Sequence, residues 1–357
     1  MLYTRNMSNK TLVDLDQWLA PHKSTIQARE KYISSKLKTI LSGKTPAEFA
    51  MGFLHFGLHK TDAGWIFREW APNATQMFLV GDFSDWKERE EFSLNRDKNG
   101  EWSINLPENS LCHGQKYKLR VYWPGGDSWR LPSYANYVVQ DENSVDFSAV
   151  VWSPKTPYNW QNNTPPKPKV PLIYEAHVGM SSQEEKVASF SEFTTEVLPR
   201  IKESGYNTIQ LMAIAEHPYY GSFGYHVSNF FAVSSRFGTP DDFKKLVDTA
   251  HGMGLRVIID LVHAHAAKNE VEGLGNFAGD PTQYFKPTNH PEWDSRLFDY
   301  GKPEVLHFLA SNCRWWLDEY HIDGFRFDGV TSMIYHDHGL GKSFTSYDDY
   351  FRDNVDK

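Results

Sequence analysis

The chain has 357 residues, which is too long for one ordinary domain of ~100–200 residues, so we expect two or three units. Its 37 Lys and Arg residues face 45 Asp and Glu, and the net charge of -8 is spread without long runs, which argues against nucleic acid or anionic membranes as partners. The cysteines, Cys112 and Cys313, lie far apart without a CxxC pattern, and no signal core or membrane-length apolar run occurs. These features predict a soluble cytoplasmic protein. They leave the oligomeric state open, a monomer being one option.

The first segment, residues 1–50, is predicted to be helical. Ser24 and Gln27 have the spacing of a capping box, and an apolar stripe follows through Ile26, Ile33 and Leu37. Gly43 is placed to end this helix.

Short strands separated by turn signals are predicted for residues 51–152. Apolar and aromatic runs at 65–68, 77–80, 102–105 and 117–121 alternate with turn pairs such as Asn99-Gly100. This punctuation is typical of a small all-β sandwich with an immunoglobulin-like arrangement. The 12 Trp residues of the chain fit a carbohydrate-binding role only weakly, because aromatic side chains are most often core.

A proline-rich linker at 153–171 leads to an alternation of strands and helices over 172–357. Such alternation predicts parallel strands with outer helices, here the first half of an α/β (β/α)8 TIM barrel that ends after about strand 4. The predicted strands are 172–177, 208–212, 256–260 and 324–328; the predicted helices are 189–204, 241–252 and 303–320, the last with Val305, Leu309, Cys313, Trp316 and Tyr320 on its apolar face.

Polar residues end two of the predicted barrel strands, at Asp260 and at Asp328. The carboxyl ends of barrel strands build the active site, and strand alternation puts Arg326 on the same side as Asp328, where it can orient the carboxylate. Two other interpretations remain open at this point. The aspartates can be helix caps with His265 a satisfied polar group, or His263 and His265 can be a metal pair.

Several motifs resemble the α-amylase superfamily of glycoside hydrolases. DLVHAH at 260–265 and GFRFDGV at 324–330 are similar to its first two signature regions. Further strings resemble glycogen branching enzymes of the eukaryote-like type, and EWAP and GDFSDW resemble the carbohydrate-binding module that those enzymes carry before the barrel. The strings, in chain order, are EWAP at 69–72, GDFSDW at 81–86, YEAHVG at 174–179, LMAI at 211–214, YYGSFGY at 219–225, WDSRLF at 293–298 and DGVTSM at 328–333.

This resemblance implies roles for individual residues. Asp328 is the implied nucleophile and Arg326 its orienting partner, while Tyr225, Asp260 and His265 shape the subsite of the attacked sugar. Trp70, and less surely Trp65, are implied glucan-stacking platforms, with sandwich core as the alternative. His226 stands where the family usually has Gln, beside the first subsite residue.

The resemblance also implies a retaining reaction without metal or organic cofactor. Such chemistry uses two carboxyl groups roughly 5–5.5 Å apart. The family's general acid, a Glu that closes the fifth strand, has no counterpart in this chain, and the contexts of Glu175 and Glu216 do not resemble it. We therefore expect a half barrel with unpaired edges that is inactive alone, poorly soluble or dependent on a complementing second half.

The implied activity is that of a 1,4-α-glucan branching enzyme. It cleaves an α-1,4 bond and transfers the chain to a C6 hydroxyl, with glycogen or α-1,4-glucan chains as partners. Two alternatives remain: an α-glucan hydrolase or debranching enzyme with the same nucleophile, or a chain that binds glycogen through its sandwich without activity.

Overall fold

The computed structural model describes residues 11–350 and residue 355, and it divides into two compact units with a boundary between Phe49 and Ala50. The first unit is helical, as expected for its described part, with α1 (Leu12–Leu15), a 3-10 segment (Gln17–His22), α2 (Lys23–Leu41) and α3 (Pro46–Phe49). The predicted capping box at Ser24 is wrong, because α2 already begins after His22 and no side chain caps it. Thr11 and Asp14 form such a box instead, at the start of α1.

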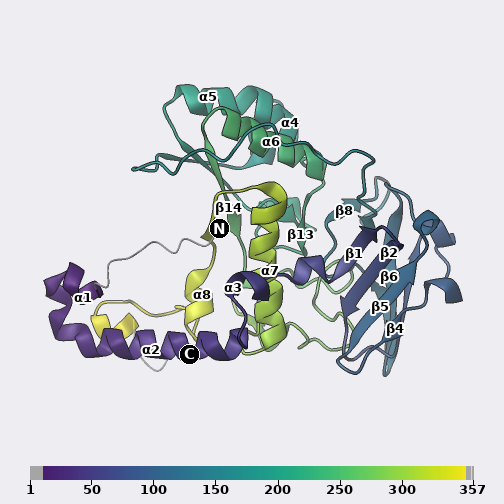
Figure 1. Cartoon of the computed structure of the whole chain (residues 1–357), viewed down its shortest axis with the longest axis horizontal. Helices are drawn as coiled ribbons and strands as arrows, with labels where there is room; N and C mark the ends of the chain where they lie inside the picture. Colours follow the sequence, from purple (N-terminus) through teal and green to yellow (C-terminus); the bar gives the residue numbers. More distant parts are fainter. Residues whose placement is uncertain (1–10, 351–354, 356–357) are drawn as a thin grey trace. The chain divides into compact units, whose positions relative to one another are not determined.

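The second unit begins with a sandwich of antiparallel strands, as predicted. One sheet has the order β1 (Gly57–Thr61), β2 (Gly64–Trp70), β5 (Glu101–Leu106), β4 (Asn95–Arg96). The other sheet contains β3 (Gln76–Gly81), β6 (Lys116–Trp123), β7 (Gly126–Arg130), β8 (Tyr137–Gln140) and β9 (Phe147–Val150). Alternate residues such as Phe67, Leu79 and Val121 are fully buried and form the core between the sheets. Figure 1 shows these strands together.

The sandwich does not end where the sequence suggests. Strands β12 (Ala215–Glu216) and β13 (Asn229–Ser234), which come from the barrel region, extend its second sheet. β13 runs parallel to β8, with Val233 opposite Tyr137, and every residue of β13 is buried. Sandwich and barrel region thus share one sheet within a single compact unit.

The barrel region forms a parallel sheet with the order β10 (Ile173–Ala176), β11 (Thr208–Leu211), β14 (Arg256–Leu261), β18 (Gly324–Phe327), which confirms the four predicted strands. In the part of the chain that the structure describes, β10 and β18 each pair on one side only. Alternating apolar residues of β14, Val257 and Ile259, are fully buried. The sheet edges therefore remain open for further backbone pairing.

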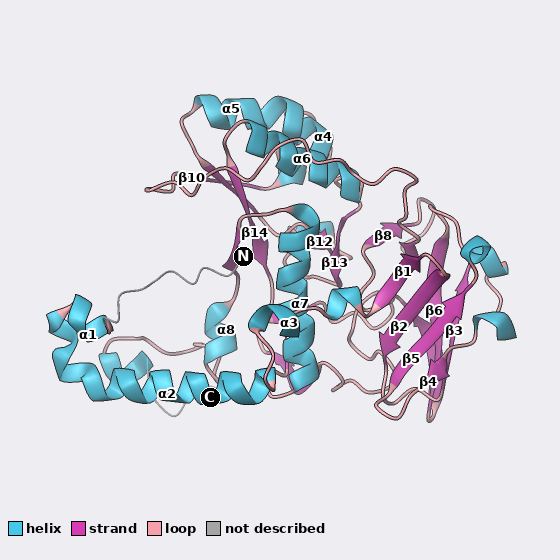
Figure 2. Cartoon of the chain, viewed as in Figure 1, coloured by secondary structure: helices cyan, strands magenta, loops and turns pink. Residues whose placement is uncertain are grey.

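The predicted helices are present. The first is continuous through α4 (Phe190–Glu192), a π-helical turn (Phe193–Val197) and α5 (Leu198–Glu203); α6 (Pro240–Gly252) and α7 (Pro303–Tyr320) follow. Figure 2 shows α4, α5 and α6 beside the strands, where α6 packs on β14. The α7 face is buried at Val305, Leu309, Trp316 and Tyr320 as predicted, whereas Cys313 is only half-buried. Among the described residues, no helix combines the length and apolar character that crossing a bilayer requires.

The segment predicted as a semi-rigid linker is fixed to the barrel region. Asp248 of α6 accepts hydrogen bonds from the Tyr158 hydroxyl (3.0 Å) and the Asn162 backbone N–H (2.8 Å). Arg256 donates to the Pro165 carbonyl (3.0 Å). These bonds, rather than proline stiffness alone, hold the connection in place.

Candidate functional site

The ends of β14 and β18 bring the predicted charged residues together. In the parallel pairing Asp260 lies opposite Arg326, and Asp328 follows β18 directly. Arg326 Nη1 donates to Asp328 Oδ1 (2.6 Å) and to Asp260 Oδ2 (3.2 Å). The guanidinium therefore holds both carboxylates at the carboxyl end of the sheet, where (β/α)-barrel enzymes place their chemistry.

Asp260 is the buried centre of this network. Its carboxylate accepts from the Tyr225 hydroxyl (2.7 Å) and from Gln210 Nε2 (2.9 Å), besides Arg326. Burial raises the pKa of Asp260, while the Tyr225 and Arg326 contacts act in the opposite direction. The helix-cap interpretation finds no support, because these partners are side chains and because α8 (Val330–Ile334) has Gly329 at its N-cap position.

A glycine brings Tyr225 into the site. Gly224 has φ +88°, and a Cβ there would lie 2.0 Å from the Ala213 carbonyl oxygen, so only glycine fits this turn. Burial first, and then the hydrogen bond to Asp260, raise the pKa of Tyr225, so its hydroxyl remains a donor near neutral pH.

His265 is neutral near pH 7, because burial lowers its pKa to about 4. Its Nε2 lies 2.9 Å from the Tyr225 carbonyl, which can only accept, so Nε2 carries the proton. The buried Nδ1 has no hydrogen-bond partner among the described residues and is therefore an acceptor. The His226 ring lies 6.1 Å from the His265 ring, with an interplanar angle of 86°, so the two histidines are neighbours at this site.

The two histidines after β14 face different partners. His263 lies in the core with Nε2 2.8 Å from Asn312 Oδ1, and burial lowers its pKa to about 4. The described residues contain no group of three His, Cys, Asp or Glu side chains that could hold a metal ion. The metal-pair interpretation therefore has no geometric support in the described structure.

Sequence reasoning missed a tryptophan at this site. The Trp293 ring lies 4.9 Å from the His265 ring, and the His290 ring stacks on the Trp293 ring with centroids 3.8 Å apart and an interplanar angle of 8°. His290 Nε2 is 3.0 Å from the Ser332 hydroxyl in α8, just after Asp328. Trp293 lies within the WDSRLF string, which supported the resemblance but was given no role of its own.

Two further carboxylates of the barrel region, Glu175 and Glu216, make hydrogen bonds of their own. Glu175 accepts from Gln210 Nε2 (3.1 Å) at the same sheet end, and its side chain is exposed. Glu216 is fully buried and accepts from Arg236 (3.0 Å) and from the Ser235 backbone N–H (2.7 Å), which gives it a structural role. Glu216 is thus enclosed by structural contacts, whereas Glu175 keeps an exposed side chain whose hydrogen bond goes to Gln210.

The two tryptophans predicted to stack on sugars, Trp65 and Trp70, differ in burial. The prediction for Trp65 is wrong, because this side chain is only 5% exposed and its Nε1 donates to the Glu108 carbonyl (3.0 Å), so it is sandwich core. Trp70 is half-buried with its ring edge-on to Tyr284 at 5.6 Å. Its role as a platform stays a prediction.

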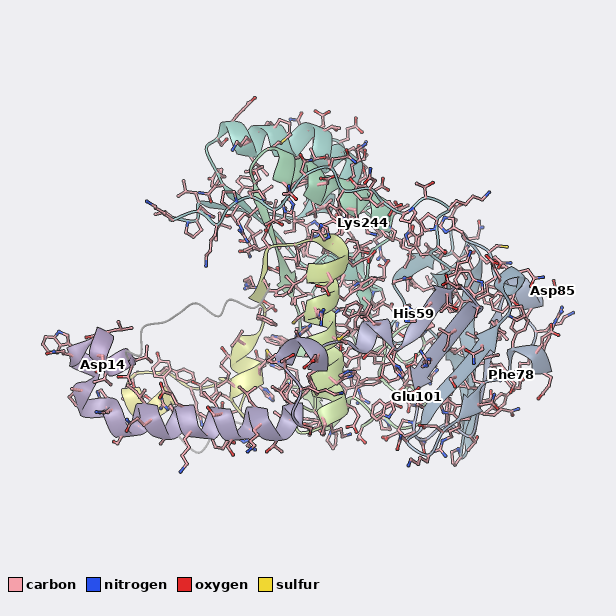
Figure 3. The ribbon with its side chains drawn as sticks, in the orientation of Figure 1. Asp14, His59, Phe78, Asp85, Glu101 and Lys244 are labelled. Atoms are coloured by element: carbon pink, nitrogen blue, oxygen red, sulfur yellow. The ribbon has the colours of Figure 1, made fainter. Side chains whose placement is uncertain are left out.

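A different aromatic pair lines the surface of the sandwich. Trp86, 37% exposed, and Trp129 lie 6.4 Å apart at 57° beside a hollow of about 630 Å³ that Lys118 also lines. The Trp86 Nε1 donates to Asp82 (2.9 Å), which fixes the ring. Figure 3 shows Asp85, the residue before Trp86, on the side of the sandwich away from Lys244. The GDFSDW string contains Trp86, but only the fold shows that β7 brings Trp129 to it.

Two segments match described protein families. Residues 55–135 match carbohydrate-binding module 48 (isoamylase N-terminal domain), and residues 193–278 match the alpha amylase catalytic domain. The first segment covers most of the sandwich, including both surface tryptophans. The second contains Tyr225, Asp260 and His265.

Curated relatives match nearly the whole chain. The chain is 48% identical to a 1,4-alpha-glucan-branching enzyme of Yarrowia lipolytica over 95% of its own length and 51% of the relative's. It is 45% identical to the same enzyme of Dictyostelium discoideum, over 99% of the chain and 54% of the relative. The chain thus spans about half the length of the curated relatives it matches.

Solved structures agree on the fold. A putative alpha amylase of Salmonella typhimurium superposes with a TM-score of 0.65 at 23% identity, over 78% of this chain and 44% of that one. The catalytic module of the pneumococcal glycogen-degrading protein SpuA gives 0.64 at 19% identity, over 76% and 46%. The chain is thus similar over nearly its whole length to the first half of 1,4-alpha-glucan-branching enzymes, with a carbohydrate-binding module 48 match in the sandwich and an alpha amylase catalytic-domain match in the barrel region.

Proposed function

We propose that this chain carries the nucleophile and the sugar subsite of a 1,4-α-glucan branching reaction. The observation that carries the proposal is the bridge from Arg326 to both Asp328 and Asp260 at the end of two adjacent parallel strands. It leaves Asp328 held at one oxygen, with its other oxygen available for attack.

The reaction begins when a carboxylate oxygen of Asp328 bonds to the anomeric carbon of a glucose unit. The α-1,4 bond breaks, and the departing O4 takes a proton from a carboxylic acid on the opposite side of the bond. The C6 hydroxyl of an acceptor glucan then attacks the same carbon, returns a proton to that carboxylate, and releases Asp328. Two inversions give a new α linkage at C6.

The neighbouring groups support binding of the attacked sugar. Asp260 is a buried acceptor, Tyr225 a hydroxyl held against it, and His265 Nδ1 an acceptor without a partner in the described structure. Sugar hydroxyls donate and accept, so they match such a mixed set. The resemblance assigns the proton donor to a Glu that closes a fifth strand, and neither Asp260, bonded to Tyr225 and Gln210, nor Glu175, bonded to Gln210, is given that role here.

The chain joined to the second half of the Yarrowia lipolytica relative provides the test. We expect this chimera to lower the iodine absorbance of amylose and to create α-1,6 linkages that a debranching enzyme releases, with little rise in reducing ends. The chain alone is expected to leave amylose unchanged. A folded chimera that raises reducing ends without new α-1,6 linkages would support the hydrolase alternative and contradict branching.

We further propose that the hollow beside Trp86 and Trp129 binds α-glucan. Replacing Trp129 by Ala in the chain is expected to weaken glycogen binding about tenfold, or roughly 1.4 kcal/mol, because a flat ring that stacks on a sugar face is lost. Affinity electrophoresis in glycogen-containing gels measures this. Trp18→Ala is the matched control, since Trp18 is 90% exposed and lies in the N-terminal unit. Equal retardation of both variants would contradict the assignment.

A further inference from the structure

One side chain, Gln210 of β11, links the carboxylates of Glu175 and Asp260. Its Nε2 donates to Glu175 Oε1 (3.1 Å) and to Asp260 Oδ1 (2.9 Å). An ionised carboxylate oxygen can only accept, so the amide nitrogen of Gln210, and not its amide oxygen, lies between the two. The orientation of this side chain is thus set by the two carboxylates that it bridges.

The pairing of three parallel strands explains the bridge. Glu175 of β10 lies directly opposite Gln210, and Gln210 lies opposite Ile258 of β14. Asp260 follows Ile258 by two residues, so its side chain leaves the sheet on the same face, nearer the carboxyl end. The long side chain of glutamine spans this diagonal between neighbouring strands.

The bridge completes the fixation of Asp260. Its other oxygen, Oδ2, accepts from the Tyr225 hydroxyl (2.7 Å) and from Arg326 Nη1 (3.2 Å), and the same nitrogen donates to Asp328 (2.6 Å). With donors on both oxygens, the buried carboxylate cannot rotate without breaking a hydrogen bond. Arg326 is therefore held beside the nucleophile partly through Asp260, and Asp260 partly through Gln210.

Charged groups from each neighbouring strand act on Asp260. Burial has the largest effect and raises the pKa of Asp260, and the negative charges of Glu175 and Asp328 raise it too, whereas Tyr225 and Arg326 lower it. Glu175 is exposed. Its charge is therefore the one in this set that can be removed without disturbing the buried centre of the network.

We propose that Gln210 is a positioning residue for the branching reaction. It fixes the Asp260 carboxylate in the orientation that shares Arg326 with the nucleophile, and it holds the charge of Glu175 next to that carboxylate. The effect on rate rests on the proposed function, whereas the effect on the ionisation of Asp260 does not. A purely structural role would change stability without moving the titration of Asp260.

Two variants of the whole chain test this role through the titration of Asp260. Gln210→Met keeps the length of the side chain and removes the donor, so the midpoint should move to higher pH, because the ionised form loses a hydrogen bond. Glu175→Gln keeps an acceptor for Gln210 and removes the charge, so the midpoint should move to lower pH. Carbon-13 NMR of labelled aspartate carboxyl groups measures the midpoint, and Asp260→Asn identifies the signal.

The same variants in the chimera test the effect on the reaction. Gln210→Met is expected to lower kcat/KM for branching about tenfold, as for loss of a hydrogen bond to a charged group, and to move the acid limb of the pH profile upward. Glu175→Gln should move that limb downward. The matched controls, Gln76→Met at the exposed start of β3 and Glu142→Gln in an exposed turn of the sandwich, should move neither.

Opposite movements of the Asp260 midpoint in the two variants, with unchanged controls, support the proposal. Movement in one direction only, or no movement in variants that near-ultraviolet circular dichroism shows to be folded, overturns it. If Gln210→Met does not fold, Glu175→Gln decides: a lower midpoint supports the link, and an unchanged midpoint overturns it. A chimera that does not branch contradicts the proposed function but leaves the NMR result standing, so the two failures are distinguishable.

Discussion

Replacing Asp328 by Asn in the chimera is expected to lower the branching rate by roughly 10⁴-fold or more, the scale on which loss of a covalent nucleophile acts. In the parent chain Arg326 donates to the Asp328 carboxylate at 2.6 Å. The amide oxygen of Asn can accept the same hydrogen bond, so the local structure should persist. An amide does not attack the anomeric carbon. The rate is measured from α-1,6 linkages formed per time.

Asp62→Asn is the control, because this substitution makes the same chemical change at an exposed position in a turn. Maltoheptaose binding by the Asp328 variant should stay within a few-fold of the parent, which separates lost chemistry from lost binding. A variant that keeps more than about a hundredth of the parent rate would show that Asp328 is not the nucleophile.

Arg236→Met is expected to destabilise the chain by about 3–5 kcal/mol near neutral pH, because it leaves the fully buried Glu216 carboxylate without its cation. Arg236 also donates to the Pro218 carbonyl (3.0 Å), which loses its partner too. Urea unfolding followed by tryptophan fluorescence measures the loss. Arg89→Met is the control, because its ion pair with Asp85 is exposed and worth ~0–1 kcal/mol.

The destabilisation should grow with pH. Burial raises the pKa of Glu216 in the folded chain above its ordinary value, so stability from this group is complete below about pH 4.5 and falls as the pH rises through the folded pKa. Removing the Arg236 charge raises that pKa further. We therefore expect a smaller loss at pH 5 than at pH 8, and equal losses would contradict a charged, buried Glu216.

Much of this architecture could be predicted from local sequence patterns. The four parallel strands followed from apolar runs such as 256–260. Strand alternation predicted the pairing of Arg326 with Asp328, and barrel geometry predicted Asp260 at the same sheet end, whereas the contact from Arg326 to Asp260 was not predicted. The capping box at Ser24 failed because helix α2 continues from a 3-10 segment, so Ser24 already lies inside the helix. A cap motif does not reveal whether a preceding turn is helical.

Long-range packing could not be predicted. Trp65 and Trp86 look alike in the sequence, yet only the fold shows that one fills the sandwich core and the other lies on its surface. Similarly, Trp293 reaches His265 through an excursion that contains β16 (Phe285–His290) and β17 (Ser295–Phe298). Contacts of this kind depend on tertiary structure rather than on local periodicity.

The strand shared between the two regions limits how they can be recombined. β13 belongs to the chain segment of the barrel but pairs with β8 of the sandwich. A crossover placed in the connecting segment 153–171 would separate these partners, leaving Val138 without its Ser234 neighbour and the wholly buried strand β13 without its partner strand in the sandwich. Exchange of the carbohydrate-binding module between enzymes thus requires a donor whose sheet edge accepts the same parallel strand. The two regions should be inherited, and engineered, as one piece.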